Sequence, residues 1–519
     1  MSYMLGIDIG TTTCKAMVTN SEGKVIAYEE SEAYSVLRPK PGWAEQNPEE
    51  WWNAVKSVVK SVASKVGSEN IASISISSME EGVVPVDKNG KPLYNCMIWQ
   101  DTRTKPQEKW VMENVGFVKV LEITGLPPAY VWSAEKVLWL KENLREVFNK
   151  TYKFLQPKDY INYMLTGEFT TDWSIAGHTQ LFDISKREWS EELMEAHGIP
   201  LDKWPEVYPS AKVIGEIRSE VAEELGLKKH IPVMAGGGDQ EVSTLGAGAI
   251  GEGEASYSAG TSNILNICVS KPVFDPRVTV FCHPHEKLWI MELYPTQLGE
   301  ALQWVSMNLW SSRGETSVYR EMDLEAEKSP IGANGLFFYP YFRGKYSSEI
   351  NENMKASIIG LTFNHSRGDI IRALMESSAY EVRDIIEFCE RKFNINIKRL
   401  VISGGVSKSP VWREIMANVL SRNLTLPQVK DTTLLGSTIL ASIGAGHYKN
   451  LEEAVSKMFK EAEIVKPNEE ISRKYRKLYF EYKKHYRCLE RIFKKPFIES
   501  NIVLEILSLY IKLRKLFKK

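Results

Sequence analysis

Asp8 lies in a stretch whose residue types suit the binding of a phosphate group. It belongs to the apolar run Met4–Ile9, which is followed by Gly10 and by three consecutive threonines, Thr11–Thr13. Glycine allows a positive φ and a close approach of the backbone, and the threonines offer hydroxyl and amide donors to an anion. Because a buried carboxylate needs a strong partner, Asp8 is predicted to orient a Mg²⁺ water shell or phosphates; simple stabilisation of the turn is the open alternative.

A second stretch repeats this pattern in the other half of the chain. The strand-like segment Glu254–Ser258 leads into Gly260, Thr261 and Ser262, again a glycine followed by hydroxyl side chains. Two such tips in corresponding places predict a clamp on a polyphosphate, and neither uses the Walker sequence, which the chain lacks. The repetition also predicts two similarly built halves with a cleft between them.

Asp239 is the candidate catalytic base. It follows three glycines after the predicted strand Ile231–Ala235 and precedes a predicted helix, which is where α/β sheets expose reactive groups. A carboxylate held there can accept the proton of a substrate hydroxyl as that oxygen attacks a γ-phosphoryl group. The local sequence leaves open a structural role as the N-cap of the helix Gln240–Leu245.

Three other motifs carry less weight. The segment Gly246–Gly251 has the spelling of a dinucleotide-binding fingerprint, but it follows a helix and precedes a strand, which is the wrong order. His283 and His285 lack clear cysteine or carboxylate company and are expected at a polar strand edge rather than on a metal. The segment Gly404–Ser407 is predicted to be a loop that could lie against a base or ribose, with a simple strand-to-helix turn as the alternative.

The composition indicates a large globular protein that acts on a small molecule. The chain has 519 residues, enough for at least two domains, and 43% of them are hydrophobic. Its 65 basic and 66 acidic residues nearly cancel, which gives no field for holding nucleic acid. The six cysteines are far apart, no membrane-length apolar run occurs, and no secretory leader is recognised, so a reducing, cytoplasmic location is expected.

Hydrophobic periodicity predicts strands alternating with helices, and therefore a mixed α/β fold. Asn47 and Pro48 provide the cap and the first position of a helix. Residues from about 102 to 209 look like an inserted helical layer, and those from about 472 like a basic helical appendage that packs or mediates assembly, with contact to a membrane surface as the alternative. The other main elements expected are Ile71–Ser77, Trp132–Glu142, Lys158–Gly167, Asp369–Lys392, Arg399–Ser403, Trp412–Ser421 and Leu434–Gly446.

These segments together resemble the FGGY carbohydrate kinases, within the larger group of ATPases that includes actin, hexokinase and the heat-shock chaperones. The resemblance extends to about Tyr448. It is carried by Gly6-Ile-Asp-Ile-Gly-Thr-Thr, Pro41-Gly-Trp-Ala-Glu-Gln-Asn-Pro-Glu-Glu-Trp-Trp, Ile98-Trp-Gln-Asp-Thr-Arg, Pro157-Lys-Asp-Tyr, Leu165-Thr-Gly-Glu, Gly238-Asp-Gln, Gly260-Thr-Ser and Ala356-Ser-Ile-Ile-Gly-Leu followed by Asp369-Ile-Ile-Arg-Ala-Leu-Met-Glu.

The resemblance implies an α/β fold of two ribonuclease-H-like domains, of the actin and hexokinase type, with an interdomain cleft. We expect a sugar-side N-terminal domain over residues 1–245, which includes the insertion at about 102–209. A nucleotide-side C-terminal domain is expected over 246–471, and the helical basic appendage over 472–519.

The resemblance also implies roles for individual residues. Asp239 is the expected catalytic base, and Asp8 and Asp239 are expected to hold Mg²⁺, with water between. The acceptor is expected to be lined by Met79, Glu80, Trp99, Asp239 and Gln240. ATP is expected to be bound by Thr11, Thr12, Lys15, Gly260, Thr261, Gly404, Gly405 and Ser409.

The activity that this resemblance implies is transfer of the γ-phosphoryl group of ATP to a hydroxyl of a small sugar or polyol, with D-xylulose as the first guess. The segment Ser78–Gly82 shares a methionine with xylulose-type kinases and a carboxylate with glycerol-type kinases, and it also resembles the kinase acting on the quorum-sensing autoinducer. Glycerol, another polyol or an autoinducer therefore stay alternatives, as does a nucleotide-operated interaction protein of the actin and chaperone group. The expected cofactor is Mg²⁺ and the expected partners are ATP and the acceptor, without nucleic acid or a membrane span; a homodimer stays open.

Overall fold

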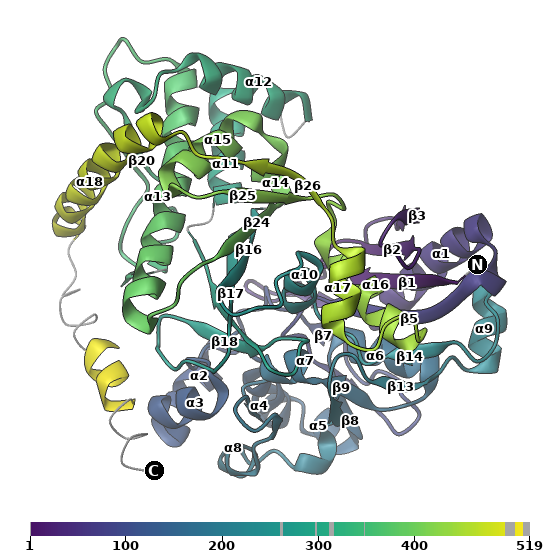
Figure 1. The fold of residues 1–519 in the computed structure, drawn as a ribbon. Helices are drawn as coiled ribbons and strands as arrows, with labels where there is room; N and C mark the ends of the chain where they lie inside the picture. The colour runs from purple at the N-terminus through teal and green to yellow at the C-terminus, as the bar shows by residue number, and fades with distance from the viewer. Residues whose placement is uncertain are drawn as a thin grey trace.

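Two sheets of seven strands, one in each half of the chain, form the framework of the protein (Figure 1). The computed structural model describes residues 2–259, 263–295, 298–310, 316–346, 348–493 and 504–511. The first sheet has the order β13-β14-β5-β1-β2-β3, with β15 beside β5, and the second has the order β18-β19-β17-β16-β24-β25-β26. The first sheet consists of β1 (Tyr3–Ile9), β2 (Cys14–Thr19), β3 (Val25–Glu30), β5 (Ile71–Ser78), β13 (Val213–Glu216), β14 (Pro232–Met234) and β15 (Gly237–Gly238). The second consists of β16 (Glu254–Ala259), β17 (Asn263–Val269), β18 (Thr279–Cys282), β19 (Trp289–Leu293), β24 (Arg399–Ser403), β25 (Leu424–Pro427) and β26 (Glu461–Val465).

The two sheets repeat one pairing pattern. In the first, β1 is antiparallel to β2 and parallel to β5; in the second, β16 is antiparallel to β17 and parallel to β24. The outer strands match as well. β14 is parallel to β5, and β25 is parallel to β24. The edge strands β13 and β26 are antiparallel to β14 and β25. The predicted duplication of a strand–tip–strand unit therefore corresponds to two copies of the same sheet topology.

The alternation of residues along β1 places Asp8 on the face of the first sheet that meets the second half of the chain. Leu5, Ile7 and Ile9 point to the opposite face, where they pack on α1 (Pro48–Val66). Met4 shares the face of Asp8 and packs against α16 (Thr432–Gly444). As the sequence predicts, Asn47 caps α1, accepting a hydrogen bond from the backbone N–H of Glu49.

Two helices cross at the junction between the halves. α10 (Asp239–Gly246) packs directly on α16, and both lie between the two sheets in Figure 1. Glycines allow this contact: a Cβ on Gly246 would lie 1.8 Å from the carbonyl oxygen of Thr432, and one on Gly436 would lie 2.0 Å from that of Val242. The first residue of α10, Asp239, is thereby fixed at the junction.

The region from 102 to 209 is less uniformly helical than the sequence analysis expected. It contains short strands as well as helices, and α6 packs in the core of the first sheet rather than in a separate layer. Its helices are α2 (Lys105–Val111), α3 (Phe117–Thr124), α4 (Ser133–Asn143), α5 (Arg145–Lys150), α6 (Pro157–Thr166), α7 (Trp173–Gly177) and α8 (Glu191–His197). Its strands are β8 (Lys153–Leu155), β9 (Thr170–Asp172), β10 (Phe182–Asp183), β11 (Glu188–Trp189) and β12 (Glu206–Tyr208). α9 (Ser219–Leu225) follows and packs on α1.

The second sheet is covered by helices of the C-terminal half. The helices of this half are α11 (Leu298–Leu309), α12 (Thr316–Lys328), α13 (Arg367–Phe393), α14 (Gly404–Lys408), α15 (Pro410–Leu420), α16, α17 (Leu451–Met458) and α18 (Glu469–Ile492). Of these, α16 packs on the first sheet, against β1, β5, β2 and β14, and α17 packs on α16. Short strand pairs lie outside both sheets: β4 (Glu45–Gln46) with β7 (Cys96–Met97), β6 (Val84–Val86) with β8, β20 (Phe337–Tyr339) with β23 (Ser357–Ile359), and β21 (Lys345–Tyr346) with β22 (Ile350–Asn351). No helix in the described part of the chain is long and apolar enough to cross a membrane.

α18 is part of the core of the second half, although the expected appendage begins within its first turn, at residue 472. Its tyrosines are buried, and their hydroxyls donate to acids on α13: Tyr475 to Glu376 at 3.0 Å, and Tyr482 to Glu381 at 3.0 Å. These two tyrosines therefore both fill the core and donate hydrogen bonds to buried carboxyl groups.

Tyr479→Ala is expected to destabilise the protein by about 3–5 kcal/mol, because it leaves a cavity and removes the hydrogen bond to Asp384. The Tyr479 side chain is 1% exposed and its hydroxyl lies 3.1 Å from Asp384 Oδ1. The next residue, Phe480, is 63% exposed, so Phe480→Ala should change stability by less than about 0.5 kcal/mol. Urea unfolding of both variants checks this, and equal losses would show that α18 is not anchored by its tyrosine face.

Candidate functional site

The turn between β1 and β2, where the sequence predicts a phosphate-binding tip, is closed by hydrogen bonds. The N–H of Gly10 donates to the carbonyl of Thr13 at 3.1 Å, and the Tyr34 hydroxyl donates to carbonyl oxygens on both sides of the turn. Thr12 is exposed at the tip. The Trp99 indole N–H donates to the hydroxyl of Thr11 at 3.0 Å, so a residue predicted for the acceptor lies against the predicted phosphate tip.

Asp8 is surrounded by other carboxylates. The hydroxyl of Ser77, on the neighbouring strand β5, donates to Asp8 Oδ1 at 2.9 Å. Burial, together with the charges of Asp239 and Asp431, raises the pKa of Asp8 from 3.8 to about 8. A buried acid that is repelled by two neighbouring acids is costly to ionise unless a cation compensates the charge.

Lys15 lies opposite Asp8 in the β1–β2 pair, and its Nζ lies 3.4 Å from Asp431 Oδ2 at the start of α16. This contact joins the first sheet to α16 across a sequence separation of 416 residues. Asp431 was not among the residues predicted from the sequence. It is the N-cap of α16 and accepts from the N–H of Leu434, and an aspartate before a helical run is the signal that could have drawn attention to it.

Asp239 opens α10 and faces Glu80. The N-cap of α10 is Gly238, so the alternative of Asp239 as the cap is wrong; Asp239 is the first residue of the helix itself. The side-chain amide of Gln240 donates to Asp239 Oδ1 at 2.8 Å, and the backbone N–H of Gln240 lies 3.2 Å from Glu80 Oε1. Burial and the charge of Glu241 raise the pKa of Asp239 from 3.8 to about 7, even though hydrogen bonds from Gln240 and Glu80 act to lower it.

Because Gly238 has no side chain, the carboxyl groups of Glu241 and Glu80 can lie close to its backbone. A Cβ on Gly238 would lie 2.3 Å from Glu241 Oε2 and 2.5 Å from Glu80 Oε1. Met79, by contrast, is 2% exposed and packs in the core of the first sheet, so its side chain supports the neighbouring acids from behind. Of the residues predicted to line the acceptor, the structure thus brings Glu80, Asp239 and Gln240 together directly, and Trp99 to the phosphate tip.

On the opposite side of the junction, Gly404 and Gly405 begin the short helix α14, so the loop predicted there is wrong. Gly404 has a φ of 73° and pairs with Ala259, whose carbonyl oxygen would lie 2.3 Å from a Cβ at Gly404. Ala259 is the residue before the second tip, and Gly260 and Thr261 themselves lie outside the described residues. Ser409 is buried, caps α15 and donates to Asp323 at 2.7 Å.

His178 is the centre of a group of acids that the sequence analysis did not find. Its Nδ1 lies 2.9 Å from Glu81 Oε1, and its Nε2 lies 3.1 Å from Glu241 Oε1 and 4.0 Å from Glu80 Oε1. Although burial alone would lower it, the carboxylates of Glu241 and Glu81 raise the pKa of His178 to about 10. With these two carboxylates as its partners, the His178 ring is favoured in its protonated, cationic form. Glu80, His178 and Glu241 also place one ligand atom each within 4.8 Å of one another.

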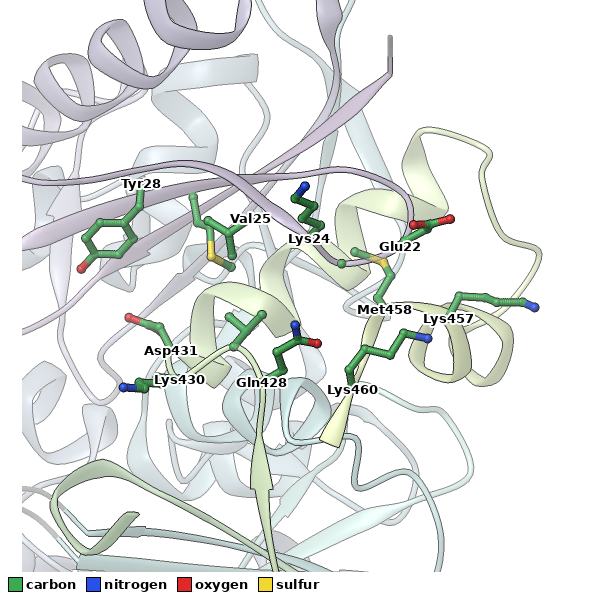
Figure 2. Close-up of a pocket in the computed structure, with 13 residues that line it drawn as sticks. Glu22, Lys24, Val25, Tyr28, Gln428, Lys430, Asp431, Lys457, Met458 and Lys460 are labelled. Carbon is green, nitrogen blue, oxygen red and sulfur yellow. The ribbon is translucent and has the colours of Figure 1, made fainter. Parts of the chain in front are cut away.

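A cavity of about 1050 Å³ lies beside this site, between the β2–β3 hairpin and the segments 428–431 and 457–460. Figure 2 shows Tyr28 and Val25 of the hairpin across from Asp431 and Gln428. Asp8, Asp239 and Glu80 are not among its lining residues. Of Asp8 and the two acids that interact with it, only Asp431 lines this cavity.

Comparisons with known proteins show which protein family the chain is similar to. The model of the FGGY family of carbohydrate kinases matches in two parts, the N-terminal domain over residues 3–246 and the C-terminal domain over residues 255–445. A xylulose kinase of Bacillus subtilis is 31% identical over 94% of this chain and 97% of its own length, and a gluconokinase of the same species is 29% identical over 92% and 94%. A glycerol kinase of Saccharolobus islandicus is 32% identical over 87% and 90%.

Among solved structures, the xylulose kinase from Rhodospirillum rubrum superposes with a TM-score of 0.86 at 26% identity, covering 95% of this chain and 100% of that one. The predicted two-domain α/β fold is thereby confirmed. The named relatives act on different acceptors, so the comparison leaves the acceptor open.

Proposed function

The chain belongs to the FGGY family of carbohydrate kinases, and we propose that this ATP-dependent kinase phosphorylates a small sugar or polyol, with D-xylulose as the first candidate. The observation that supports this most is the pair of carboxylates at the domain junction, Asp8, which is buried, and Asp239, which is half-buried, next to a turn of glycine and threonines. Each carboxylate has a raised pKa, and the charge of Asp239 contributes to the shift of Asp8. In such a pair, one carboxylate can hold a metal ion while the other accepts a proton.

In the proposed reaction, Asp239 accepts the proton of an acceptor hydroxyl. The hydroxyl oxygen forms a bond to the γ-phosphorus while the bond between that phosphorus and the β–γ bridging oxygen breaks, and ADP leaves. Gln240 keeps the Asp239 carboxylate oriented through its 2.8 Å hydrogen bond. Glu80 and Trp99 complete the proposed acceptor side, whereas Met79, predicted to line it, is buried in the core of the first sheet and would act only through its neighbours.

The residues around Asp8 fit a Mg²⁺ ion. The donor set is carboxylate oxygen, which Mg²⁺ prefers, and the mutual repulsion of Asp8, Asp239 and Asp431 is what a divalent cation would relieve. When bound, the ion would neutralise charge on the β- and γ-phosphates. We propose that Asp8 and Asp239 hold it, through water.

The nucleotide is proposed to lie between the two tips. Thr11, Thr12 and Lys15 would contact phosphates from the first domain, and Gly260 and Thr261 from the second. Gly404, Gly405 and Ser409 are proposed to adjoin the nucleoside, with Ser409 acting mainly through the end of α15 that it caps.

Acceptor-stimulated ADP release, measured with a panel of pentuloses, hexuloses, glycerol, erythritol and inositol, tests this proposal. We expect at least one acceptor to raise the rate of ADP release by about 100-fold or more over the rate without acceptor. D-xylulose is expected to be among the best. Slow ATP hydrolysis that no acceptor changes would instead favour a nucleotide-operated interaction protein.

A further inference from the structure

The last described residues of the chain, 504–511, form a separate helix on the second domain. Figure 1 shows it in yellow at the edge of the molecule, apart from α18 and close to the end marked C. Ser508 and Ile511 lie on its inner face and are 0% and 1% exposed. The match to the C-terminal family model ends at residue 445, so the kinase pattern does not account for this helix.

Glu505 fixes the helix to the second domain. Its carboxylate accepts a hydrogen bond from Arg277 Nη1 at 2.8 Å and forms an ion pair with Lys392 of α13. The Arg277 guanidinium is itself held by Asp275, which is completely buried, at a distance of 2.8 Å. Because two cations of the second domain bind one carboxylate of the helix, the helix has a defined orientation and turns one face to solvent.

The outer face of this helix is apolar. Ile506, Leu509 and Tyr510 are 59%, 58% and 51% exposed, and their spacing of three and four residues places them side by side. A helix that is apolar on all sides is normally buried on all sides. Here one side packs on the protein and the other faces solvent, and such an apolar patch marks a surface that binds a partner.

The charge of the residues that follow indicates the kind of partner. The eight residues after Ile511 contain five cations and no acid: Lys512-Leu-Arg-Lys-Leu-Phe-Lys-Lys519. The whole chain, by contrast, has a net charge of −1. A second copy of this chain would bring the same five positive charges together, which disfavours pairing of two such helices. Nucleic acid would match the charge but would leave the apolar face uncovered, whereas an anionic lipid surface matches both.

We propose that residues 504–519 bind the enzyme to the surface of an anionic lipid membrane, without crossing it. Ile506, Leu509 and Tyr510 would enter the boundary between headgroups and acyl chains, and the five cations would lie against the anionic headgroups. Tyrosine suits this boundary, since its ring is apolar and its hydroxyl is polar. Both contributions are needed, because a short apolar face without the charges gives only weak and reversible binding.

Sedimentation of the full chain with lipid vesicles tests the proposal. The vesicles consist of phosphatidylcholine alone or of phosphatidylcholine with about one third phosphatidylglycerol, which is anionic. The apparent affinity should be at least about 100-fold higher for the anionic vesicles. Raising the salt concentration from about 0.05 to about 0.5 M should lower it by about tenfold or more, because salt screens the cations. Equal binding to the two kinds of vesicle, or binding to neither, would overturn the proposal.

The contribution of the charges is measured with the triple variant Lys512→Gln, Arg514→Gln and Lys515→Gln. Each Lys or Arg near an anionic surface contributes about fivefold to the affinity, so this variant should bind anionic vesicles about 100-fold more weakly. The matched control removes three exposed cations from α18: Arg476→Gln, Lys477→Gln and Lys484→Gln. The control should bind within about threefold of the unmodified protein. Equal weakening in the two triple variants would contradict the assignment of binding to residues 504–519.

The contribution of the apolar face is measured with the double variant Ile506→Ser and Leu509→Ser. It should bind anionic vesicles about tenfold more weakly or less tightly still, because it loses most of the apolar area that enters the membrane. Phe480→Ser, at a 63% exposed position of α18, is the matched control and should bind as the unmodified protein does. Light scattering without vesicles measures the oligomeric state of the same samples. A dimer that the double variant abolishes, together with unchanged vesicle binding, would assign the face to a second copy of the chain and overturn the proposal.

Discussion

Asp239→Asn is expected to lower the turnover of acceptor phosphorylation by about 10²–10⁴-fold, which is the contribution of a general base. Asparagine has nearly the same shape as aspartate, so α10 and its contact with α16 should persist. It cannot accept the acceptor's proton, because the amide is not basic. ATP affinity, measured by calorimetry without acceptor, should change by less than about tenfold, since Asp239 is proposed to contact Mg²⁺ only through water.

Two further variants distinguish the loss of a base from a general disturbance of the enzyme. Asp239→Glu keeps a carboxylate but moves it, so it should retain more turnover than Asp239→Asn. Asp202→Asn removes an exposed aspartate far from the junction in sequence and should leave the kinetics unchanged. An Asp239→Asn enzyme with most of its turnover would show that the proton leaves by another route.

The sequence predicted the framework well because its signals there are local. The strand Met4–Ile9 has apolar residues on both faces, and the structure buries both, between α1 and α16. The cap at Asn47 and the glycine–threonine turn are also readable from a few adjacent residues. The duplication was visible because the same short pattern recurs after a second predicted strand, and the strand pairing bears it out.

Contacts between residues that are far apart along the chain could not be predicted from the sequence. Lys15 pairs with Asp431, and His178 joins Glu81 to Glu241. Lys15 and the segment around Glu81 were noticed in the sequence, but their partners Asp431, His178 and Glu241 were not, because the sequence does not show that α10 and α16 meet at the junction. The predicted loop at Gly404 failed for a related reason: the glycine is required by the close approach of Ala259, and the chain turns immediately into a helix.

Asp8→Asn should have opposite effects on activity and on stability. Turnover should fall by about 10²–10³-fold, because the site loses a carboxylate proposed for Mg²⁺. The free energy of unfolding without Mg²⁺ should instead rise by a few kcal/mol at pH 8, because a buried charge that repels Asp239 and Asp431 is removed. Urea unfolding and steady-state kinetics of the same preparation measure both quantities.

The pH dependence identifies Asp8 as the cause of this stabilisation. The pKa of Asp8 is 3.8 ordinarily and about 8 in the folded protein, so between these values the folded state retains a proton that the unfolded chain releases. Its contribution to stability is therefore largest below about pH 4 and is lost as the pH rises toward 8. The gain of Asp8→Asn over the wild type should grow across this interval and shrink when saturating Mg²⁺ stabilises the wild type. A gain that is equal at pH 5 and pH 8 would contradict the assignment of buried charge to Asp8, and a wild-type stability indifferent to Mg²⁺ would contradict its proposed role at the metal.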